Sequence, residues 1–246
     1  MEFWATNLIV IPMPTALIRI YTPDGFVVAA DGRSTENPTN RVITDEAQKI
    51  FRLGRAIAAS LCGSSNLVNP QTHFKFDFVE ELLAASQPIS PKRYQTLQDY
   101  AGELAHRVNR NLELAQQSGN LIFPSIPAYE PEDYGDTITI IWLNGYHNDR
   151  AASARVRLSH EGQRLLAPSL RTEPLLLLKP FAYGIQKIAD MLVAKDRSVV
   201  RYLNVDVDTA HSLDLRIALT FSSAFIDACG GPEAMTYRRT YSRRHC

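Results

Sequence analysis

The sequence contains few cysteines and no paired histidines, and these shortages exclude several kinds of site. Its three cysteines, Cys62, Cys229 and Cys246, are too few and too widely spaced for a disulfide framework, which favours a reducing compartment and therefore the cytoplasm. The six histidines form no HxH or HxxxH pattern, so the chain lacks the usual ligand spacing of a zinc site. We therefore expect no metal.

The sequence also lacks an excess of charge of either sign and a long apolar run. Its 26 basic residues balance its 26 acidic residues, so no overall field attracts it to nucleic acid or to an anionic membrane. No apolar run approaches the ~20 residues that span a bilayer, and Glu2 stands where a signal peptide carries positive charge. A local basic excess lies in "YRRTYSRRHC", residues 237–246, which form either a solvated end or a basic docking tail.

What the sequence does contain is a series of short β-type segments in its first sixty residues. Residues 15–22 and 25–31 are rich in branched apolar residues and flank the turn sequence "TPDG", which predicts a hairpin. Residues 31–48 are polar and interrupted by Gly and Pro, so we expect a loop there. Two further strands are predicted at residues 49–53 and 56–63.

Helical spacing of apolar residues follows these strands. It predicts helices over residues 64–86 and 90–119, the second with Ser90 and Pro91 as its cap and first-turn pair. One face of this second helix is apolar: Leu97, Tyr100, Ala101, Leu104, Val108 and Leu112. Residues 119–135 are rich in Pro and Tyr, and we expect them to form a long loop insertion.

The second half of the chain repeats this order of strands and helices. Three strands, two helices and a last strand are predicted, at residues 137–145, 151–160, 164–168, 181–195, 208–229 and 233–239. Separate blocks of strands and helices indicate an α+β fold rather than a doubly wound parallel sheet. Two packed antiparallel sheets with a helix pair on each outer side, a four-layer αββα sandwich, satisfy both blocks within a single domain over residues 1–246.

The segment "TALIRIYTPDGFVVAADGRST", residues 15–35, resembles the opening of proteasome β-type subunits and their bacterial relatives, the N-terminal-threonine members of the N-terminal nucleophile (Ntn) hydrolases. In that family a Thr begins the first strand and an Asp follows sixteen residues later, as Thr15 and Asp31 do here. The family's lysine and glycine correspond to Lys49, at the head of a strand, and Gly63, fourteen residues further on. The resemblance implies the four-layer proteasome-like fold, with residues 1–14 as a propeptide or N-terminal extension.

The resemblance also implies a threonine-type peptidase or amidase that needs no cofactor. Thr15 becomes the nucleophile once residues 1–14 are removed, because its freed α-amino group then takes the proton of its hydroxyl. The ammonium of Lys49 favours the neutral amine, and the carboxylate of Asp31 holds that lysine. The backbone N–H of Gly63 stabilises the tetrahedral oxyanion. The implied partners are a peptide or amide substrate and further copies of the chain, in a ring or a helical assembly.

The chain departs from the family pattern at three places, which keeps a second hypothesis open. Pro14 stands before Thr15, where the family usually has Gly; residues 176–179 replace its Gly/Ser pattern; and Cys229 stands where it has a serine. A non-catalytic subunit of the same fold, serving assembly or binding, would keep the four matched residues for folding. An Ntn amidase that acts on a small molecule is a third hypothesis.

Two other groups of residues suggest different chemistry. Cys62, beside Gly63, is a thiol, but no histidine stands near it in the sequence, and a buried strand cysteine is the simpler interpretation. Asp206 and Asp208 are acidic neighbours that suggest a cation site, although a helix N-cap at Asp208 or Thr209 explains them more simply.

Overall fold

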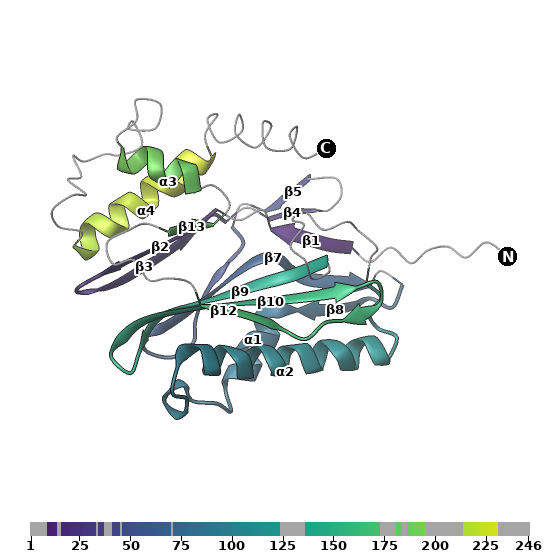
Figure 1. The fold of residues 1–246 in the computed structure, drawn as a ribbon. Coiled ribbons are helices and arrows are strands. Elements are labelled where there is room, and N and C mark those ends of the chain that lie inside the picture. Colours follow the sequence, from purple (N-terminus) through teal and green to yellow (C-terminus); the bar gives the residue numbers. More distant parts are fainter. Residues whose placement is uncertain are drawn as a thin grey trace. The chain divides into compact units, whose positions relative to one another are not determined.

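The computed structural model describes residues 9–13, 16–32, 34–36, 41–44, 46–69, 71–123, 136–172, 181–183, 186–194 and 214–230. In these residues the chain belongs to the α+β class, with antiparallel sheets and few helices, as the sequence predicts. It divides into two compact units, one of Met1–Pro14 with Gly32–Pro174 and one of Thr15–Asp31 with Leu175–Cys246 (Figure 1).

An antiparallel sheet built around one long strand dominates the first unit. Its described strands are β1 (Ile9–Met13), β6 (Ile50–Arg52), β7 (Ile57–Asn69), β8 (Phe74–Asp77), β9 (Asp136–His147), β10 (Arg150–Glu161), β11 (Arg164–Leu165) and β12 (Ser169–Thr172). The order is β1-β7-β9-β10-β11, with β6 and β8 also pairing with β7 and β12 pairing with β10. β7 changes partners along its length: residues 57–63 pair with β9 and residues 58–60 with β6, whereas β1 pairs between residues 63 and 68 and β8 with residues 66–69. We call residues 57–62 the first half of β7 and residues 63–69 its second half.

The prediction of a loop over residues 31–48 is wrong in part. Two short strands, β4 (Ser34–Glu36) and β5 (Arg41–Thr44), lie in this segment and pair with each other. The run of β-branched residues Val42, Ile43 and Thr44 explains β5, because such side chains favour extended backbone. The rest of the segment is polar, and this composition predicts a loop rather than a pair of strands.

The prediction of a helix over residues 64–86 is also wrong over its first half. The chain continues as β7 to Asn69, turns, and returns as β8 before α1 (Phe78–Ser86) begins. The side chain of Asn69 holds the turn by accepting from the backbone N–H groups of Gln71 at 3.0 Å and Thr72 at 3.4 Å. Asp77 then caps α1 by accepting from two backbone N–H groups of the first turn.

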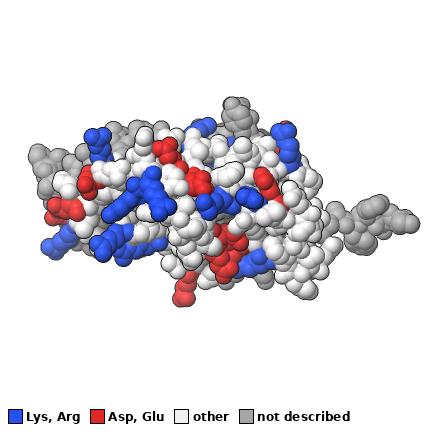
Figure 2. All heavy atoms as spheres, turned by 90° about the horizontal axis from the view of Figure 1, so that it is seen from below, with Lys and Arg blue, Asp and Glu red and all other residues white. Residues whose placement is uncertain are grey.

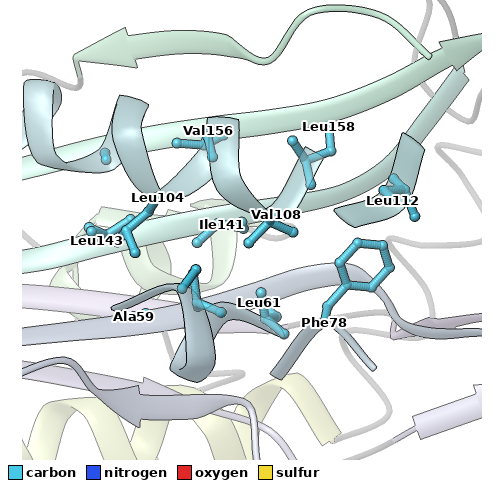
Figure 3. Close-up of a cluster of buried hydrophobic side chains, with 14 of the residues drawn as sticks. Ala59, Leu61, Phe78, Leu104, Val108, Leu112, Ile141, Leu143, Val156 and Leu158 are labelled. Atoms are coloured by element: carbon cyan, nitrogen blue, oxygen red, sulfur yellow. The ribbon is translucent and has the colours of Figure 1, made fainter. Parts of the chain in front are cut away.

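The long helix α2 (Leu97–Gln117) confirms the predicted apolar face, all of whose members are buried. The helix starts later than predicted, because Thr96 and Asp99 form a capping box there. Ser90 and Pro91 precede a short 3₁₀ turn, η1 (Pro91–Arg93), instead. Figure 3 shows Leu104, Val108 and other α2 side chains meeting those of β7, β9 and β10, which form the core of this unit.

The face of the molecule that Figure 2 shows carries charges of both signs. In Figure 2, which looks from below the view of Figure 1, basic and acidic side chains are interspersed. On α2, for example, Arg107 donates to Glu103 at 2.6 Å, one turn away. This arrangement agrees with the balanced composition. In the residues that the structure describes, no helix has the length and apolar character needed to cross a membrane.

The second unit is a smaller sheet covered by two helices. Its described elements are β2 (Leu17–Thr22), β3 (Gly25–Ala30), β13 (Phe181–Tyr183), α3 (Gln186–Val193) and α4 (Leu215–Gly230). The order of the strands is β13-β2-β3, and the β2–β3 pair confirms the predicted hairpin. Ile18, Ile20 and Val27 pack in one cluster with residues of both helices, chiefly Ile188, Leu192, Phe221 and Phe225.

The first predicted helix of this unit begins later than expected, and the second is described only from Leu215 onwards. Residues 181–183 form strand β13, because their backbone pairs with β2, and the helix begins only at Gln186. The described part of the second helix begins at Leu215, where Asp214 accepts from the backbone N–H of Ile217 at 2.7 Å. The predicted cap at Asp208 or Thr209, the last strand at residues 233–239 and most of the 119–135 insertion lie outside the described residues.

Candidate functional site

Gly63 lies at the point where β7 changes partners. It pairs with Thr139 in the last register position shared with β9 and with Met13 in the first position shared with β1. Its φ of +100° lies in a region that other residues rarely adopt, and a Cβ there would lie 3.2 Å from the carbonyl oxygen of Ile138. The position therefore requires glycine, and the positive φ turns the preceding peptide away from the regular strand orientation.

The peptide unit between Cys62 and Gly63 accepts a hydrogen bond from a side chain. The hydroxyl of Thr139 donates to the carbonyl oxygen of Cys62 at 3.3 Å, and Thr139 is fully buried. Cys62 itself is a buried strand residue, as the simpler interpretation of this thiol predicts. The N–H of this Cys62–Gly63 peptide is the group that the sequence suggests as an oxyanion donor.

Lys49 is a buried lysine in the same unit, one position before β6. It is 2% exposed, although lysine is almost never fully buried unless its charge is compensated. Its backbone oxygen accepts from the N–H of Leu61 at 3.1 Å, which extends the β6–β7 pairing by one residue towards Gly63. The first unit thus carries both residues, with Lys49 across from Leu61 and Gly63 two positions further along β7.

Asp31 lies in the second unit, directly after β3, and its carboxylate holds the start of β2. The Oδ1 atom accepts from the backbone N–H of Ala16 at 3.2 Å, while the Asp31 N–H donates to the Ala16 carbonyl at 3.0 Å. Asp31 therefore closes the β2–β3 hairpin beside the residue that follows Thr15. The next residue, Gly32, accepts from the N–H of Ala47 at 2.8 Å, two positions before Lys49.

The predicted nucleophile lies outside the described residues, as does Pro14 before it. The described residues on either side of this pair, Met13 and Ala16, nevertheless interact with predicted site residues. Met13 is the ladder partner of Gly63, and Ala16 donates to Asp31. Residues 176–179 and the pair Asp206 and Asp208 also lie outside the described part.

Strand β1 is the feature of this region that the sequence interpretation missed. Residues 9–13 form an edge strand on the second half of β7, with an irregular register between Val10 and Pro12. An edge or a bulge is where a strand tolerates proline, because that residue has no N–H to donate. A signal for this strand is present in the sequence, since Ile9, Val10 and Ile11 are consecutive β-branched residues.

The face of the first sheet opposite α2 carries a buried polar layer that the sequence interpretation also missed. Register places Ser60, Trp142 and Arg155 in one row across β7, β9 and β10, between the rows that pack on the helix. Ser60 and Trp142 are buried, and the Arg155 guanidinium lies 5.7 Å from the centre of the Trp142 ring. In the sequence these residues alternate with core residues. Such alternation is typical of a strand with one buried face, and it does not indicate that the second face is buried as well.

The described residues hold no group of three or more His, Cys, Asp or Glu side chains suited to a metal ion. What they offer instead is a buried lysine, a turned backbone peptide and a carboxylate, the kinds of group that acid–base and oxyanion chemistry use. A search of protein-family models and a search of curated proteins found no match to this chain.

Proposed function

We propose that this chain is a proteasome-like threonine-type peptidase or amidase that acts through Thr15 after removal of residues 1–14. The observation that carries the proposal concerns the two described residues on either side of Pro14 and Thr15. Met13 pairs with Gly63, and Ala16 donates to the Asp31 carboxylate. These contacts anchor the chain on both sides of the Pro14–Thr15 bond to residues of the proposed site.

In the proposed reaction the hydroxyl oxygen of Thr15 attacks the carbonyl carbon of an amide bond. The freed α-amino group of Thr15, which has an ordinary pKa of roughly 7.7–8.0, takes the hydroxyl proton. The N–H of Gly63 donates to the resulting oxyanion. The intermediate collapses by passing the proton to the departing amine, and water then hydrolyses the ester on Thr15. Lys49 keeps the amine neutral by its charge, and Asp31 orients Lys49.

We also propose that the two sheets pack face to face in a four-layer αββα sandwich. Supporting this, each sheet buries residues on the face opposite its own helices. On β2 these are Leu17, Arg19 and Tyr21, and on the sheet of the first unit they include Ser60 and Trp142. Assembly into a homo-oligomer follows only by analogy with the family, and light scattering on the purified protein tests it.

A second candidate function is that of a non-catalytic subunit of the same fold. The observation that favours it is the pairing of β1 with the second half of β7, including the position of Gly63. While the Pro14–Thr15 bond is intact, Thr15 has no α-amino group, so it cannot act as its own base. An uncut chain therefore serves binding or assembly.

Intact mass spectrometry of the purified protein separates the two candidates. The peptidase loses residues 1–14, whereas Thr15→Ala retains them and forms no adduct with a peptide electrophile directed at N-terminal threonine. A wild-type protein that keeps its full mass, and that Thr15→Ala matches in every assay, would falsify the catalytic proposal. Thr96→Ala, in the α2 cap, controls for loss of a threonine elsewhere.

A further inference from the structure

We propose that Thr139 is a positioning residue, which orients the Gly63 N–H by holding the Cys62 carbonyl. This inference rests on the proposed function, because it assigns Thr139 a task in the same reaction. The carbonyl of Cys62 and the N–H of Gly63 belong to one planar peptide unit. A hydrogen bond to that oxygen therefore sets the direction in which the N–H points.

The geometry around this peptide explains why it needs a support. The φ of +100° at Gly63 departs from the extended backbone of a regular strand, so the Cys62–Gly63 peptide is turned relative to its neighbours. The Thr139 hydroxyl donates to the Cys62 oxygen at 3.3 Å across the β7–β9 pair. The Cα of Thr139 also lies 3.3 Å from where a Cβ on Gly63 would be. One residue thus bonds the peptide and packs against its glycine.

The surroundings of Thr139 indicate that its hydroxyl, and not only its volume, matters. Thr139 is fully buried, and its chain neighbours Ile138 and Ile140 are buried apolar residues. A hydroxyl in such a place costs free energy unless it is hydrogen-bonded, and valine has nearly the same shape without this cost. The Cys62 oxygen satisfies the hydroxyl. A bond to the carbonyl also polarises the N–H of the same peptide, which strengthens its donation to an oxyanion.

The effect belongs to the transition state, since the oxyanion forms only there. Loss of a whole oxyanion donor lowers kcat by roughly 10²–10³-fold. Thr139→Val leaves the Gly63 N–H in place but removes its support, so we expect a smaller loss in kcat, about tenfold to a hundredfold. The KM should change by less than about twofold, because binding of the ground state does not use the oxyanion contact.

The test compares Thr139→Val with Thr139→Ser, which restores a hydroxyl, and with Thr137→Val on the same strand. The Thr137 hydroxyl accepts from Arg157 at 2.7 Å, away from the Cys62 carbonyl. Steady-state turnover of a fluorogenic peptide should fall in Thr139→Val alone, and thermal unfolding checks that each variant is folded. If Thr139→Val does not fold, Thr139→Ala removes the same hydroxyl.

A second readout follows the peptide itself and needs no activity. Labelling cysteine with carbonyl ¹³C and glycine with ¹⁵N selects the two Cys–Gly peptides, Cys62–Gly63 and Cys229–Gly230. Thr139→Val should shift the Cys62–Gly63 resonance, Thr139→Ser should return it towards the wild-type position, and Cys229–Gly230 in α4 should stay unchanged as the internal control.

Four outcomes would overturn the inference. An active wild type with an unchanged kcat in Thr139→Val, or an equal loss in Thr139→Val and Thr139→Ser, contradicts the role of Thr139 and leaves the proposed function intact. An unmoved Cys62–Gly63 resonance in Thr139→Val contradicts the orienting hydrogen bond. A wild type that is unprocessed and inactive contradicts the proposed function, and the catalytic role of Thr139 with it.

Discussion

The two halves of β7 have the same strand backbone over most of their length but differ in what they contribute. In the first half Ala59 and Leu61 are fully buried in the core with α2, and the ladder to β9 is regular. The second half begins with the positive φ of Gly63, continues with Ser64, Ser65 and Asn66 before the buried Leu67, and pairs with a strand of irregular register. The comparison teaches that apolar volume stabilises both halves, through Ala59 and Leu61 in the first and Leu67 in the second, and that the backbone conformation of Gly63 distinguishes the second.

The largest effect is expected from Gly63→Ala, which changes both stability and the proposed reaction. Backbone strain costs on the order of 1–3 kcal/mol, and the new Cβ contact with the Ile138 oxygen at 3.2 Å adds to it. Displacement of the Gly63 N–H should lower turnover by about 10²-fold or more. Urea unfolding and peptide hydrolysis measure the two effects.

Gly54→Ala is the matched control for that substitution. Gly54 has a φ of +103°, close to that of Gly63, but nothing lies within 4 Å of where its Cβ would be. It therefore reports backbone strain alone. Equal losses of stability in the two variants would show that close packing against β9 adds nothing, and unchanged turnover in Gly63→Ala would remove Gly63 from the site.

The next effect is expected from Leu61→Ala, two residues earlier in the same strand. It should lower the free energy of unfolding by about 3 kcal/mol, because it leaves a cavity against α2. The kcat of the folded protein should stay as in the wild type. Leu114→Ala, at a side chain 54% exposed on α2, is the control and should be nearly neutral. If Leu61→Ala lowers kcat as much as Gly63→Ala does, the two halves of β7 are not separable.

A smaller change of stability is expected when β1 is absent. A chain that starts at Thr15, released from a cleavable fusion, loses the pairing of β1 with the second half of β7. We expect a cost of about 1–2 kcal/mol, since an edge strand contributes few net hydrogen bonds. The same chain should hydrolyse a peptide at once, because it carries a free Thr15 amine. The same shortened chain with the substitution Thr15→Ala controls for nonspecific hydrolysis, and equal inactivity of both favours the non-catalytic subunit.

These two halves also explain how far the sequence alone could lead. Periodicity predicted the α2 face, from Leu97 to Leu112, and turn chemistry predicted the β2–β3 hairpin, because both depend on neighbouring residues. The sequence predicts a helix where β7 continues beyond Gly63, because the apolar residues there fit the spacing of a helix as well as that of a strand. Pairing with β8 determines that this segment is a strand. The pairing of Met13 with Gly63 joins residues fifty positions apart, which no local pattern contains. The family resemblance suggested the four candidate residues, Thr15, Asp31, Lys49 and Gly63, but not the contacts of Ala16 and Thr139 beside them.

The smallest change in stability is expected from Tyr100→Phe. Tyr100 lies on α2, in the core cluster that contains the first half of β7. Burial, with a smaller contribution from Tyr94, raises the pKa of Tyr100 from 10.0 to about 12. Between these two values the unfolded chain binds fewer protons than the folded one, so stability falls as the pH rises above 10. Tyr100→Phe removes this component, and urea unfolding at about pH 9 and about pH 11 should therefore show a smaller loss in the variant. An equal loss in both proteins would mean that Tyr100 ionises in the folded protein as readily as in water, and that α2 shields the first half of β7 less than its packing indicates.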